Sequence, residues 1–311
     1  MIGIILAAGR GTRMRDLTRE RPKAMLPVVG QPIIGRVLGQ LSRAGLSEVI
    51  IVVASDDRHV RPYFEANPPA GVQLTFVTQS APRGMAQALL EAAPYIRAPF
   101  ILTACDSLYP DEHYQQLAQK HGQGNSPATL TLIEAPPEVI VRASSVELVN
   151  DRVVRVVEKP ALADAPSNIA SLALYAFELR ILDYLQRVQP SSRGELELQD
   201  AIQLMIAASG GLAALTTPWR WELTAPEDLL LVNLNVLAMT PALRVSPPGL
   251  AVTPPVFVEA GVSLPAEAQL GPNVYLESGA RIGAKARLKN CVVLRSGLVS
   301  PGQTVEEALI F

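Results

Sequence analysis

The sequence contains few of the residues that build disulfide frameworks or zinc sites. It has two cysteines, Cys105 and Cys291, and three histidines, without a Cys/His cluster. This excludes a disulfide-stapled fold and a structural zinc site, and reduced thiols favour a cytoplasmic location. No apolar run approaches the roughly 18 residues of a membrane-spanning helix, so no membrane partner is expected. The apolar N-terminal stretch lacks the preceding basic residues of a signal peptide.

Charge is also scarce. Charged residues make up 18% of the chain, and 27 basic residues against 29 acidic ones leave a formal charge of −2. A protein that binds nucleic acid through counterion release would normally show a basic excess, so no nucleic-acid partner is expected. Hydrophobic residues form 49% of the 311 residues, which is enough for a large core and predicts about two domains.

Short apolar runs alternate with helical patterns through the first 240 residues. The runs at 2–7, 48–53, 74–77 and 100–105 predict buried strands, and 146–149 with 152–158 predicts a hairpin around Asn150-Asp151. The segments 33–44, 84–93, 110–121, 195–209 and 226–239 predict helices. The rhythm predicts an α/β fold: a Rossmann-like, mixed, mostly parallel sheet with helices on both faces.

The pattern changes after residue 240. Five prolines between 240 and 255 predict a linker, and apolar residues then recur every six positions. One series is Val258, Leu264, Leu270, Leu276, Ile282, Leu288 and Leu294, and a second is Val256, Val262, Ala268, Val274, Ala280, Ala286, Val292 and Leu298. A parallel β-helix of about three coils is therefore expected. The predicted organisation is a domain at 1–239, a linker at 240–255 and a β-helix at 256–311. Because the apolar edges of the β-helix need to be covered, we expect it to pack against the first domain or against another subunit, and we expect a homo-oligomer.

A glycine-containing loop follows the first predicted strand, with the sequence Leu-Ala-Ala-Gly-Arg-Gly-Thr-Arg-Met at residues 6–14. Gly9 and Gly11 allow a tight turn whose N–H groups approach a phosphate. A Walker A loop requires a following Gly-Lys-Ser/Thr, which this sequence does not have. A dinucleotide-binding fingerprint requires a third glycine, and Met14 stands at that position. Glycine spacing alone leaves a phosphate-binding loop and a plain tight turn equally open.

Further motifs follow this loop in a fixed order. They are Arg-Pro-Lys-Ala-Met-Leu-Pro-Val at 21–28, Gln-Ser-Ala-Pro-Arg-Gly-Met-Ala-Gln-Ala at 79–88, Cys105-Asp106, Glu158-Lys159-Pro160, Ser167-Asn168 and Arg-Gly-Glu-Leu-Glu-Leu-Gln-Asp at 193–200. Together they resemble the sugar-1-phosphate nucleotidylyltransferases over about residues 1–238, closest to the glucose-1-phosphate thymidylyl- and uridylyltransferases. The C-terminal repeat is similar to that of longer members such as the mannose-1-phosphate guanylyltransferases, which implies a left-handed hexapeptide β-helix.

The resemblance implies a Mg²⁺-dependent reaction in which a sugar 1-phosphate, expected to be a hexose phosphate, attacks the α-phosphorus of a nucleoside triphosphate, with dTTP or UTP favoured, and releases pyrophosphate. The implied catalytic residues are Arg13, Lys23 and Asp106. The implied nucleotide-binding residues are Leu6, Ala8, Gly9, Gly11, Thr12, Arg13, Gln79 and Gly84. The implied sugar-phosphate-binding residues are Glu158, Lys159, Asn168 and Arg193, and the implied metal ligands are Asp106 and Glu222.

Several positions depart from the family pattern. Glu222-Leu223-Thr224 aligns with the family's Asp-x-Gly, which adds a methylene to a metal ligand and a side chain to a glycine position. Ser144 stands near the sugar, where the family often has glycine. Altered sugar choice or reduced activity is the expected consequence for an enzyme. The alternative to an enzyme is a non-catalytic homologue that binds nucleotide sugar and regulates a partner. An acyltransferase acting through the β-helix is disfavoured, because no histidine follows His121 as a general base.

Overall fold

The computed structural model describes residues 1–9, 11–124, 126–240 and 250–311. The chain forms two compact units: unit 1 comprises Met1–Gly9 and Arg36–Arg220, and unit 2 comprises Arg10–Gly35 and Trp221–Phe311. Residues 10–35 therefore group with the C-terminal part of the chain. The domain boundaries at 239 and 255 stay predictions, and residues 241–249 of the expected linker lie outside the described residues, as does Arg10 of the expected phosphate loop.

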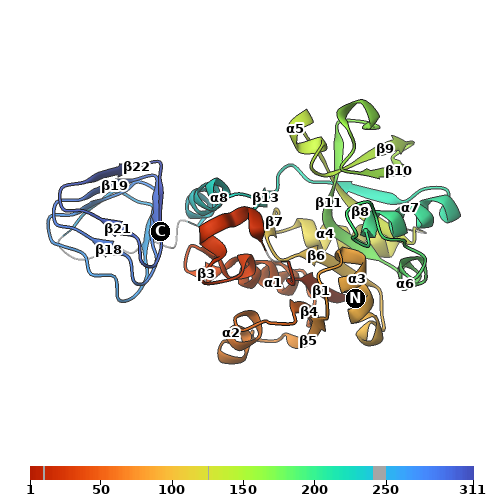
Figure 1. Cartoon of the computed structure of the whole chain (residues 1–311), viewed down its shortest axis with the longest axis horizontal. Coiled ribbons are helices and arrows are strands. Elements are labelled where there is room, and N and C mark those ends of the chain that lie inside the picture. Colours follow the sequence, from red (N-terminus) through yellow and green to blue (C-terminus); the bar gives the residue numbers. More distant parts are fainter. Residues whose placement is uncertain (10, 125, 241–249) are drawn as a thin grey trace. The chain divides into compact units, whose positions relative to one another are not determined.

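Unit 1 is built on a nine-stranded mixed sheet (Figure 1), in the order β10-β9-β11-β6-β1-β4-β5, with β8 beside β11 and β12 beside β8. The strands are β1 (Ile2–Leu6), β4 (Glu48–Ala54), β5 (Gln73–Gln79), β6 (Phe100–Ala104), β8 (Ala128–Glu134), β9 (Ser144–Val149), β10 (Arg152–Glu158), β11 (Ile169–Phe177) and β12 (Ala213–Thr216). A short strand β7 (Ser107–Leu108) follows β6.

The half of the sheet around β1 is parallel. Strand β1 pairs in parallel with β4 and β6, and β4 pairs in parallel with β5, which confirms the four predicted strands. Strands β1, β4 and β6 are largely buried, because both faces of a parallel sheet are covered, whereas the edge strand β5 is buried only at Val77 and Gln79. The carboxyl ends of parallel strands share one edge of the sheet, where ligands bind in open α/β folds.

The other half is antiparallel. The predicted hairpin is present as β9 and β10, and both Asn150 and Asp151 in its turn have positive φ, 49° and 60°. Strand β11 pairs antiparallel with β6, β8 and β9, and this central strand was not among the predicted elements.

Helices cover both faces of the sheet. The helices of unit 1 are α1 (Ile33–Arg43, whose first three residues group with unit 2), α2 (Val60–Ala66), α3 (Met85–Ala92), α4 (His113–Gln123), α5 (Pro137–Ile140), α6 (Ile181–Leu185) and α7 (Leu198–Ser209), with 3₁₀ turns η3 (Ala93–Tyr95) and η4 (Leu162–Asp164). Helix α8 (Pro226–Met239) and the 3₁₀ turns η1 (Thr12–Thr18) and η2 (Lys23–Met25) belong to unit 2. Ile4 of β1 packs with α3, α6 and α7, while a Cβ on the neighbouring Gly3 would lie 3.2 Å from Leu41 of α1. Because successive strand residues face opposite sides, α1 and α3 lie on opposite faces, as predicted.

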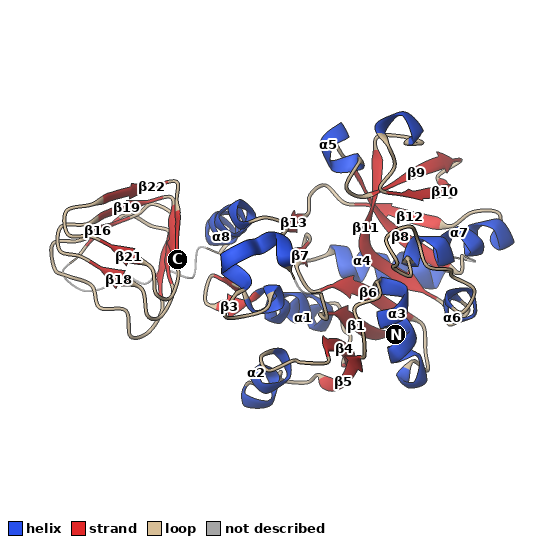
Figure 2. Ribbon diagram, in the orientation of Figure 1, coloured by secondary structure: helices blue, strands red, loops and turns tan. Residues whose placement is uncertain are grey.

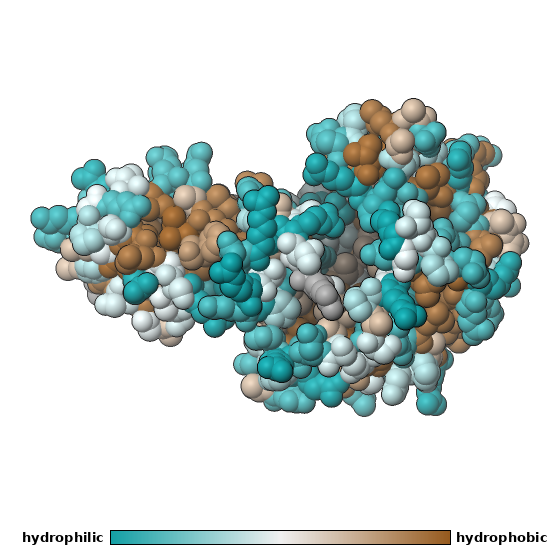
Figure 3. Space-filling model, in the orientation of Figure 1, coloured by the Kyte–Doolittle hydropathy of each residue, from teal (hydrophilic) through white to brown (hydrophobic). Residues whose placement is uncertain are grey.

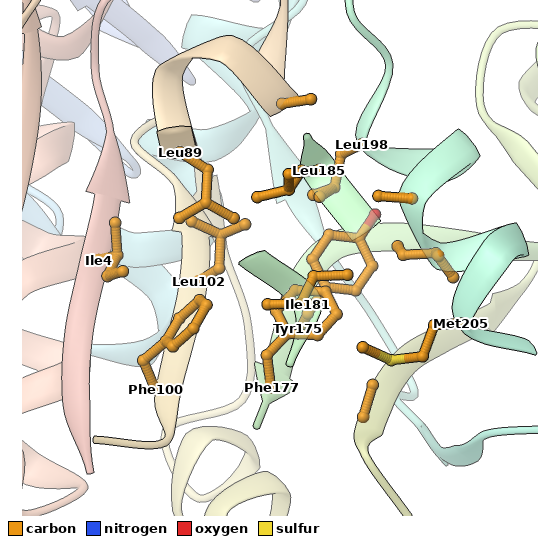
Figure 4. Packing of buried hydrophobic residues seen from close by; sticks show 14 of the residues in the cluster. Ile4, Leu89, Phe100, Leu102, Tyr175, Phe177, Ile181, Leu185, Leu198 and Met205 are labelled. Atoms are coloured by element: carbon orange, nitrogen blue, oxygen red, sulfur yellow. The ribbon is translucent and has the colours of Figure 1, made fainter. Parts of the chain in front are cut away.

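The core between the sheet and α3, α6 and α7 is apolar and closely packed (Figure 4). Phe100 and Leu102 of β6 face Tyr175 and Phe177 of β11, and the Phe100 and Phe177 ring centroids are 5.7 Å apart. Burying such side chains contributes roughly 1.5–3 kcal/mol each to the free energy of unfolding. This core fixes the strand ends on which the unit 1 site residues lie.

Two predicted helices begin three residues later than expected, α4 at His113 and α7 at Leu198. The segment predicted as a helix at 195–209 forms α7 only from Leu198, and Gly210, in the left-handed region at φ 69°, ends it. The reason lies in Leu196: its N–H donates to the Arg83 carbonyl at 2.7 Å, and its carbonyl accepts from the Ala86 N–H at 3.1 Å. These bonds hold Leu196 in extended form, which is incompatible with a helical turn.

Unit 2 contains the predicted parallel β-helix (Figure 2). Its three parallel sheets are β14-β16-β19-β22, β15-β17-β20-β23 and β18-β21. The strands are β14 (Ala251–Val252), β15 (Val256–Val258), β16 (Gln269–Leu270), β17 (Val274–Leu276), β18 (Arg281–Ile282), β19 (Arg287–Lys289), β20 (Cys291–Val293), β21 (Leu298–Val299), β22 (Thr304–Glu306) and β23 (Leu309–Ile310). Unit 2 also holds the small hairpin of β2 (Pro27–Val28) and β3 (Gln31–Pro32), the short strand β13 (Trp221–Glu222) and α8.

The six-residue period fails near the end of the repeat. Val256 pairs with Val274, an 18-residue step, but Val274 pairs with Cys291, a 17-residue step, so one residue is missing from the turn at Asn290. In the later strands, the residues that point into the β-helix are therefore shifted by one position relative to the six-residue series. Leu298, which the second series places inside, is 56% exposed, while Val299 beside it is fully buried.

Both cysteines are free and buried, in agreement with the expected absence of a disulfide. Teal, hydrophilic residues cover much of the visible surface of unit 1, with brown residues in separate patches (Figure 3). Among the described residues, no helix combines the length and apolar character that crossing a membrane requires.

Candidate active site

The end of β1 leads directly into the predicted phosphate loop. Leu6 is the last residue of the strand, Ala8 is buried and Gly9 is exposed. A Cβ on Gly9 would meet no described heavy atom within 4 Å, and the backbone there is outside the left-handed region. The packing of the described chain does not itself require glycine at this position.

The next glycine has a different environment. Gly11 lies in the left-handed region at φ 62°, and a Cβ there would come within 2.9 Å of Lys23 Cβ. Thr18 Oγ1 donates to the Gly11 carbonyl at 3.3 Å, which fixes the turn. Unit 2 thus brings the loop next to the lysine predicted to neutralise phosphate charge. Thr12 and Arg13, at the start of η1, are exposed.

Asp106 follows the carboxyl end of β6, one of the parallel strands, and is 7% exposed. The Ser107 hydroxyl donates to Asp106 Oδ1 at 3.4 Å. A carboxylate at such a strand end suits Mg²⁺, which takes one or two carboxylates together with water and substrate oxygens. Among the described residues, no group of three or more His, Cys, Asp or Glu side chains is placed to hold a metal ion by itself.

Gln79 ends β5 and is buried. Its amide donates to the Gly84 carbonyl at 3.2 Å and to Gln87 Oε1 at 2.6 Å, which orients the side chain. Gly84 has φ 98°, and a Cβ there would lie 2.5 Å from the Leu196 carbonyl oxygen. Glycine at 84 is therefore required by the backbone of residue 196, and this contact ties the predicted base-reading segment to the Arg-Gly-Glu-Leu-Glu stretch.

Glu158, at the end of β10, is the centre of a charged cluster. Lys159 Nζ lies 3.4 Å and Arg193 Nη2 lies 3.8 Å from Glu158 Oε1. Ser144 Oγ donates to the other oxygen, Oε2, at 2.5 Å. Arg193 Nη2 also lies 2.7 Å from Glu197 Oε1. Two exposed cations therefore flank one oriented carboxylate, an arrangement that can bind a phosphate next to a group that donates hydrogen bonds.

Asn168 is more loosely placed. Its side chain is exposed, and its carbonyl accepts from the Ala135 N–H at 2.9 Å. Ser145 Oγ donates to the neighbouring Ser167 carbonyl at 2.9 Å, so β9 holds both this segment and, through Ser144, Glu158.

Comparison with known proteins identifies the family. Residues 2–233 match the protein family described as Nucleotidyl transferase. This chain belongs to that family.

Two relatives and two solved structures illustrate the membership. The UTP–glucose-1-phosphate uridylyltransferase AglF of Haloferax volcanii is 30% identical over 231 residues, 73% of this chain and 93% of that protein. The bifunctional protein GlmU of Methanococcus maripaludis is 28% identical over 239 residues, 76% of this chain and only 54% of that protein. A UDP-glucose pyrophosphorylase complexed with UDP-glucose has a TM-score of 0.70 at 22% identity, covering 77% of this chain and all 100% of that one. A thymidylyltransferase structure from Bacillus anthracis, described as a putative glucose-1-phosphate enzyme, has a TM-score of 0.67 at 23% identity, covering 75% of this chain and 94% of that one.

These findings confirm the family resemblance, the fold class and the enzyme class predicted from the ordered motifs: this nucleotidyl transferase is of the sugar-1-phosphate type. The roles assigned to individual side chains stay predictions. The site residues divide between the two units: Gly11, Thr12, Arg13, Lys23 and Glu222 belong to unit 2, and the others to unit 1.

The departure at Glu222-Leu223-Thr224 is accommodated by the backbone. Thr224 is not among the residues with positive φ, so the fold does not need glycine there. Instead, the N–H groups of Thr224 and Ala225 both donate to Asp228 Oδ2 at 2.7 Å, which caps the start of α8.

Two acidic residues near Arg193 were not among the site residues predicted from the sequence. Glu197 is buried and bonds Arg193, and Asp200 lies in the first turn of α7. Burial raises the pKa of Asp200, the negative charges of Glu197 and Glu158 raise it further, and Arg193 partly opposes them. The Arg-Gly-Glu-Leu-Glu-Leu-Gln-Asp motif contains both residues, but its linear order does not say which acid meets the arginine.

Proposed function

We propose that this nucleotidyl transferase joins a hexose 1-phosphate to dTTP or UTP in a Mg²⁺-dependent reaction, giving a nucleotide sugar and pyrophosphate. The observation that carries the proposal is the Glu158 carboxylate flanked by Lys159 and Arg193. A phosphorylated sugar offers both of the groups that such a cluster recognises, because its hydroxyls donate to a carboxylate and its phosphate attracts cations. Asn168 contributes a further amide at this side.

The triphosphate is assigned to the loop after β1. Leu6 and Ala8 lead into it, and Gly9, Gly11 and Thr12 supply backbone N–H groups. Arg13 binds the departing β- and γ-phosphates, and Lys23 neutralises charge at the α-phosphate. The open space around Gly9 supports this assignment, because a side chain there would occupy the room that a phosphate needs.

The reaction has one displacement. A phosphate oxygen of the sugar phosphate forms a bond to the α-phosphorus, and the bond from that phosphorus to the bridging oxygen of the β-phosphate breaks. Pyrophosphate leaves with the electron pair, and no covalent enzyme intermediate is formed. The residues of the chain act by positioning the two anions and offsetting their charge.

Asp106 and Glu222 are the residues that would hold Mg²⁺. When bound, the ion neutralises phosphate charge and orients the phosphate oxygens. Gln79, with its amide already oriented by Gln87 and Gly84, is proposed to hydrogen-bond the pyrimidine edge.

The test is release of pyrophosphate over a panel of sugar 1-phosphates and nucleoside triphosphates, with Mg²⁺ and with excess chelator. We expect turnover with a hexose 1-phosphate and dTTP or UTP, and none with chelator. Asp106→Asn should remove turnover, while Asp111→Asn, which breaks the exposed pair of Asp111 with Arg43, should retain it. Binding of a nucleotide sugar by calorimetry without any turnover would instead support a regulatory homologue.

Two further features belong to the proposal. A cytoplasmic location agrees with the two free cysteines. Assembly into a homo-oligomer through the β-helix is proposed because a short stack of coils has open apolar ends; sedimentation of the full chain tests it, and a monomer at all concentrations would contradict it.

A further inference from the structure

The β-helix of unit 2 contacts the segment that carries Lys23. Arg21, two residues before Lys23, forms a bidentate ion pair with Glu277, which directly follows β17: Nη1 faces Oε1, and Nη2 lies 2.9 Å from Oε2. The Arg21 side chain is 10% exposed and that of Glu277 8%. Solvent screens a pair this buried far less than it screens a surface ion pair.

Glu277 is held by more than Arg21. The Arg295 N–H donates to Glu277 Oε2 at 2.8 Å, and Arg295 Nε lies 3.7 Å from Oε1. Burial alone would raise the pKa of Glu277, but the hydrogen bond and charge of Arg21, together with Arg295, hold it below its ordinary value. The carboxylate is therefore ionised and fixed at neutral pH, which makes it a rigid anchor for the guanidinium.

The other end of the same segment is also fastened to unit 2. A Cβ on Gly30 would lie 2.7 Å from Phe257 Cε1 of β15, so the backbone there is packed directly against the β-helix. Between the ends, the fully buried Asn233 of α8 accepts from the Val29 N–H at 2.8 Å and donates to the Pro27 carbonyl at 3.1 Å. Helix α8 in turn contacts β17, β20 and β23. Lys23 thus lies on a short segment that the β-helix and α8 hold at three points.

We propose that Arg21 and Glu277 are positioning residues, through which the β-helix holds the Lys23 segment in its working conformation. The proposal rests on the function of Lys23 given above. It assigns the C-terminal repeat a part in the nucleotidyl transfer itself, because loss of the ion pair removes one of the three attachments and leaves Lys23 less ordered. Catalysis by positioning is sensitive to such displacements: a shift of about 1 Å can reduce the rate about 100-fold.

The variant Glu277→Gln tests this in the full-length protein, because it keeps the shape of the side chain and removes its charge. Hydrogen exchange should show faster exchange of the amides of residues 23–30, with the strands of unit 1 and β17–β20 unchanged. The matched control is Glu306→Gln, which breaks the exposed Lys289–Glu306 pair of the same β-helix and touches none of the residues 21–30. Unchanged exchange in residues 23–30 would overturn the proposal.

Kinetics supply the second readout. We expect kcat to fall about tenfold to 100-fold in Glu277→Gln, with the KM for the sugar 1-phosphate within about twofold, because the sugar-phosphate residues lie on unit 1. A merely structural role would instead lower the amount of folded protein and leave kcat per folded molecule unchanged. Faster exchange with an unchanged kcat would overturn the positioning role.

One further variant and the wild-type protein separate the possible failures. If Glu277→Gln does not fold, Arg21→Lys keeps the charge but not the bidentate geometry, and a smaller fall in kcat is expected. If the wild-type protein shows no turnover with any substrate pair, the proposed function fails. The exchange measurement still decides whether the ion pair holds the segment, because it needs no substrate.

Discussion

Gly11 and Lys23 are in direct contact: a Cβ placed on Gly11 would lie 2.9 Å from the Cβ of Lys23. They are twelve positions apart in the sequence, so this contact joins the loop after β1 to the Arg-Pro-Lys motif. A larger side chain at position 11 would therefore displace Lys23.

Gly11→Ala should therefore damage both stability and activity. The left-handed backbone and the contact with Lys23 together should lower the free energy of unfolding by about 1–3 kcal/mol. Urea unfolding measures this, and pyrophosphate release should fall at least about tenfold as Lys23 is displaced. Gly122→Ala is the control: that glycine lies inside α4, where a Cβ meets nothing within 4 Å, and alanine should stabilise the helix by about 0.5–1 kcal/mol. A stable, fully active Gly11→Ala protein would contradict the contact.

Gly9→Ala should give the opposite combination. Its backbone is unstrained and its Cβ would point into open space, so stability should change by less than about 0.5 kcal/mol. Activity should nevertheless fall, because the methyl group occupies room that the triphosphate needs, and the KM for the nucleotide should rise at least about tenfold. Wild-type kinetics in this variant would show that Gly9 is not part of the triphosphate-binding loop.

Ser144→Ala tests how Glu158 is oriented. The Ser144 hydroxyl donates to Glu158 Oε2, while Oε1 faces Lys159 and Arg193. Without this bond the carboxylate can turn, and the KM for the sugar 1-phosphate should rise about threefold to tenfold, with the KM for the nucleotide unchanged. Ser209→Ala, which removes a hydroxyl bonded to the Met205 carbonyl in α7, should leave both values unaltered. A change in the KM for the nucleotide alone would show that Ser144 acts at the nucleotide and not at the sugar 1-phosphate.

His113 predicts a pH dependence of stability. Burial lowers the pKa of His113 to about 4, with a smaller opposing effect of Glu112, and its Nε2 lies 3.1 Å from Thr131 Oγ1. Between its unfolded pKa of about 6.5 and its folded pKa, the unfolded state binds the proton and the folded state does not. The stability due to neutral His113 is thus complete above about pH 6.5 and is lost as pH falls, by about 2 kcal/mol between pH 7.5 and 5.

His113→Gln isolates this contribution. Glutamine keeps a hydrogen-bonding group for Thr131 but does not titrate, so its loss of stability between pH 7.5 and 5 should be smaller by about 2 kcal/mol. Denaturant unfolding at several pH values measures the difference, and the other buried histidine, His121, is common to both proteins and cancels. Parallel curves for the two proteins would show that His113 is protonated equally in both states.

The parallel half of the sheet and most helices could be predicted because their signals are local. The apolar run of β4 can be recognised without knowing its partners, and so can the helical spacing of the apolar residues in α1. Strands β8, β11 and β12 were not predicted, and β11 has the sequence Ile-Ala-Ser-Leu-Ala-Leu-Tyr-Ala-Phe, whose alanines and serine gave no clear strand signal. Its conformation is set by three neighbouring strands, which a local pattern does not contain.

The candidate site shows the same division. The ordered motifs identified the family, but Gly84 is shaped by the Leu196 backbone, 112 positions away, and the β-helix phase slips at Asn290 by a single residue. The sequence alone predicts neither the contact at Gly84 nor the shift at Asn290, because both depend on which distant residues pack beside them in the folded chain.

The sequence by itself determined the fold class, the family and the enzyme class, because buried strands, hexapeptide repeats and ordered motifs are properties of neighbouring residues. Tertiary structure alone decided that residues 10–35 join the C-terminal unit, and that Arg21 meets Glu277 across 256 positions. Such contacts between distant residues are selected by packing and charge in the folded chain, where the free energy of burying a pair depends on its whole surroundings.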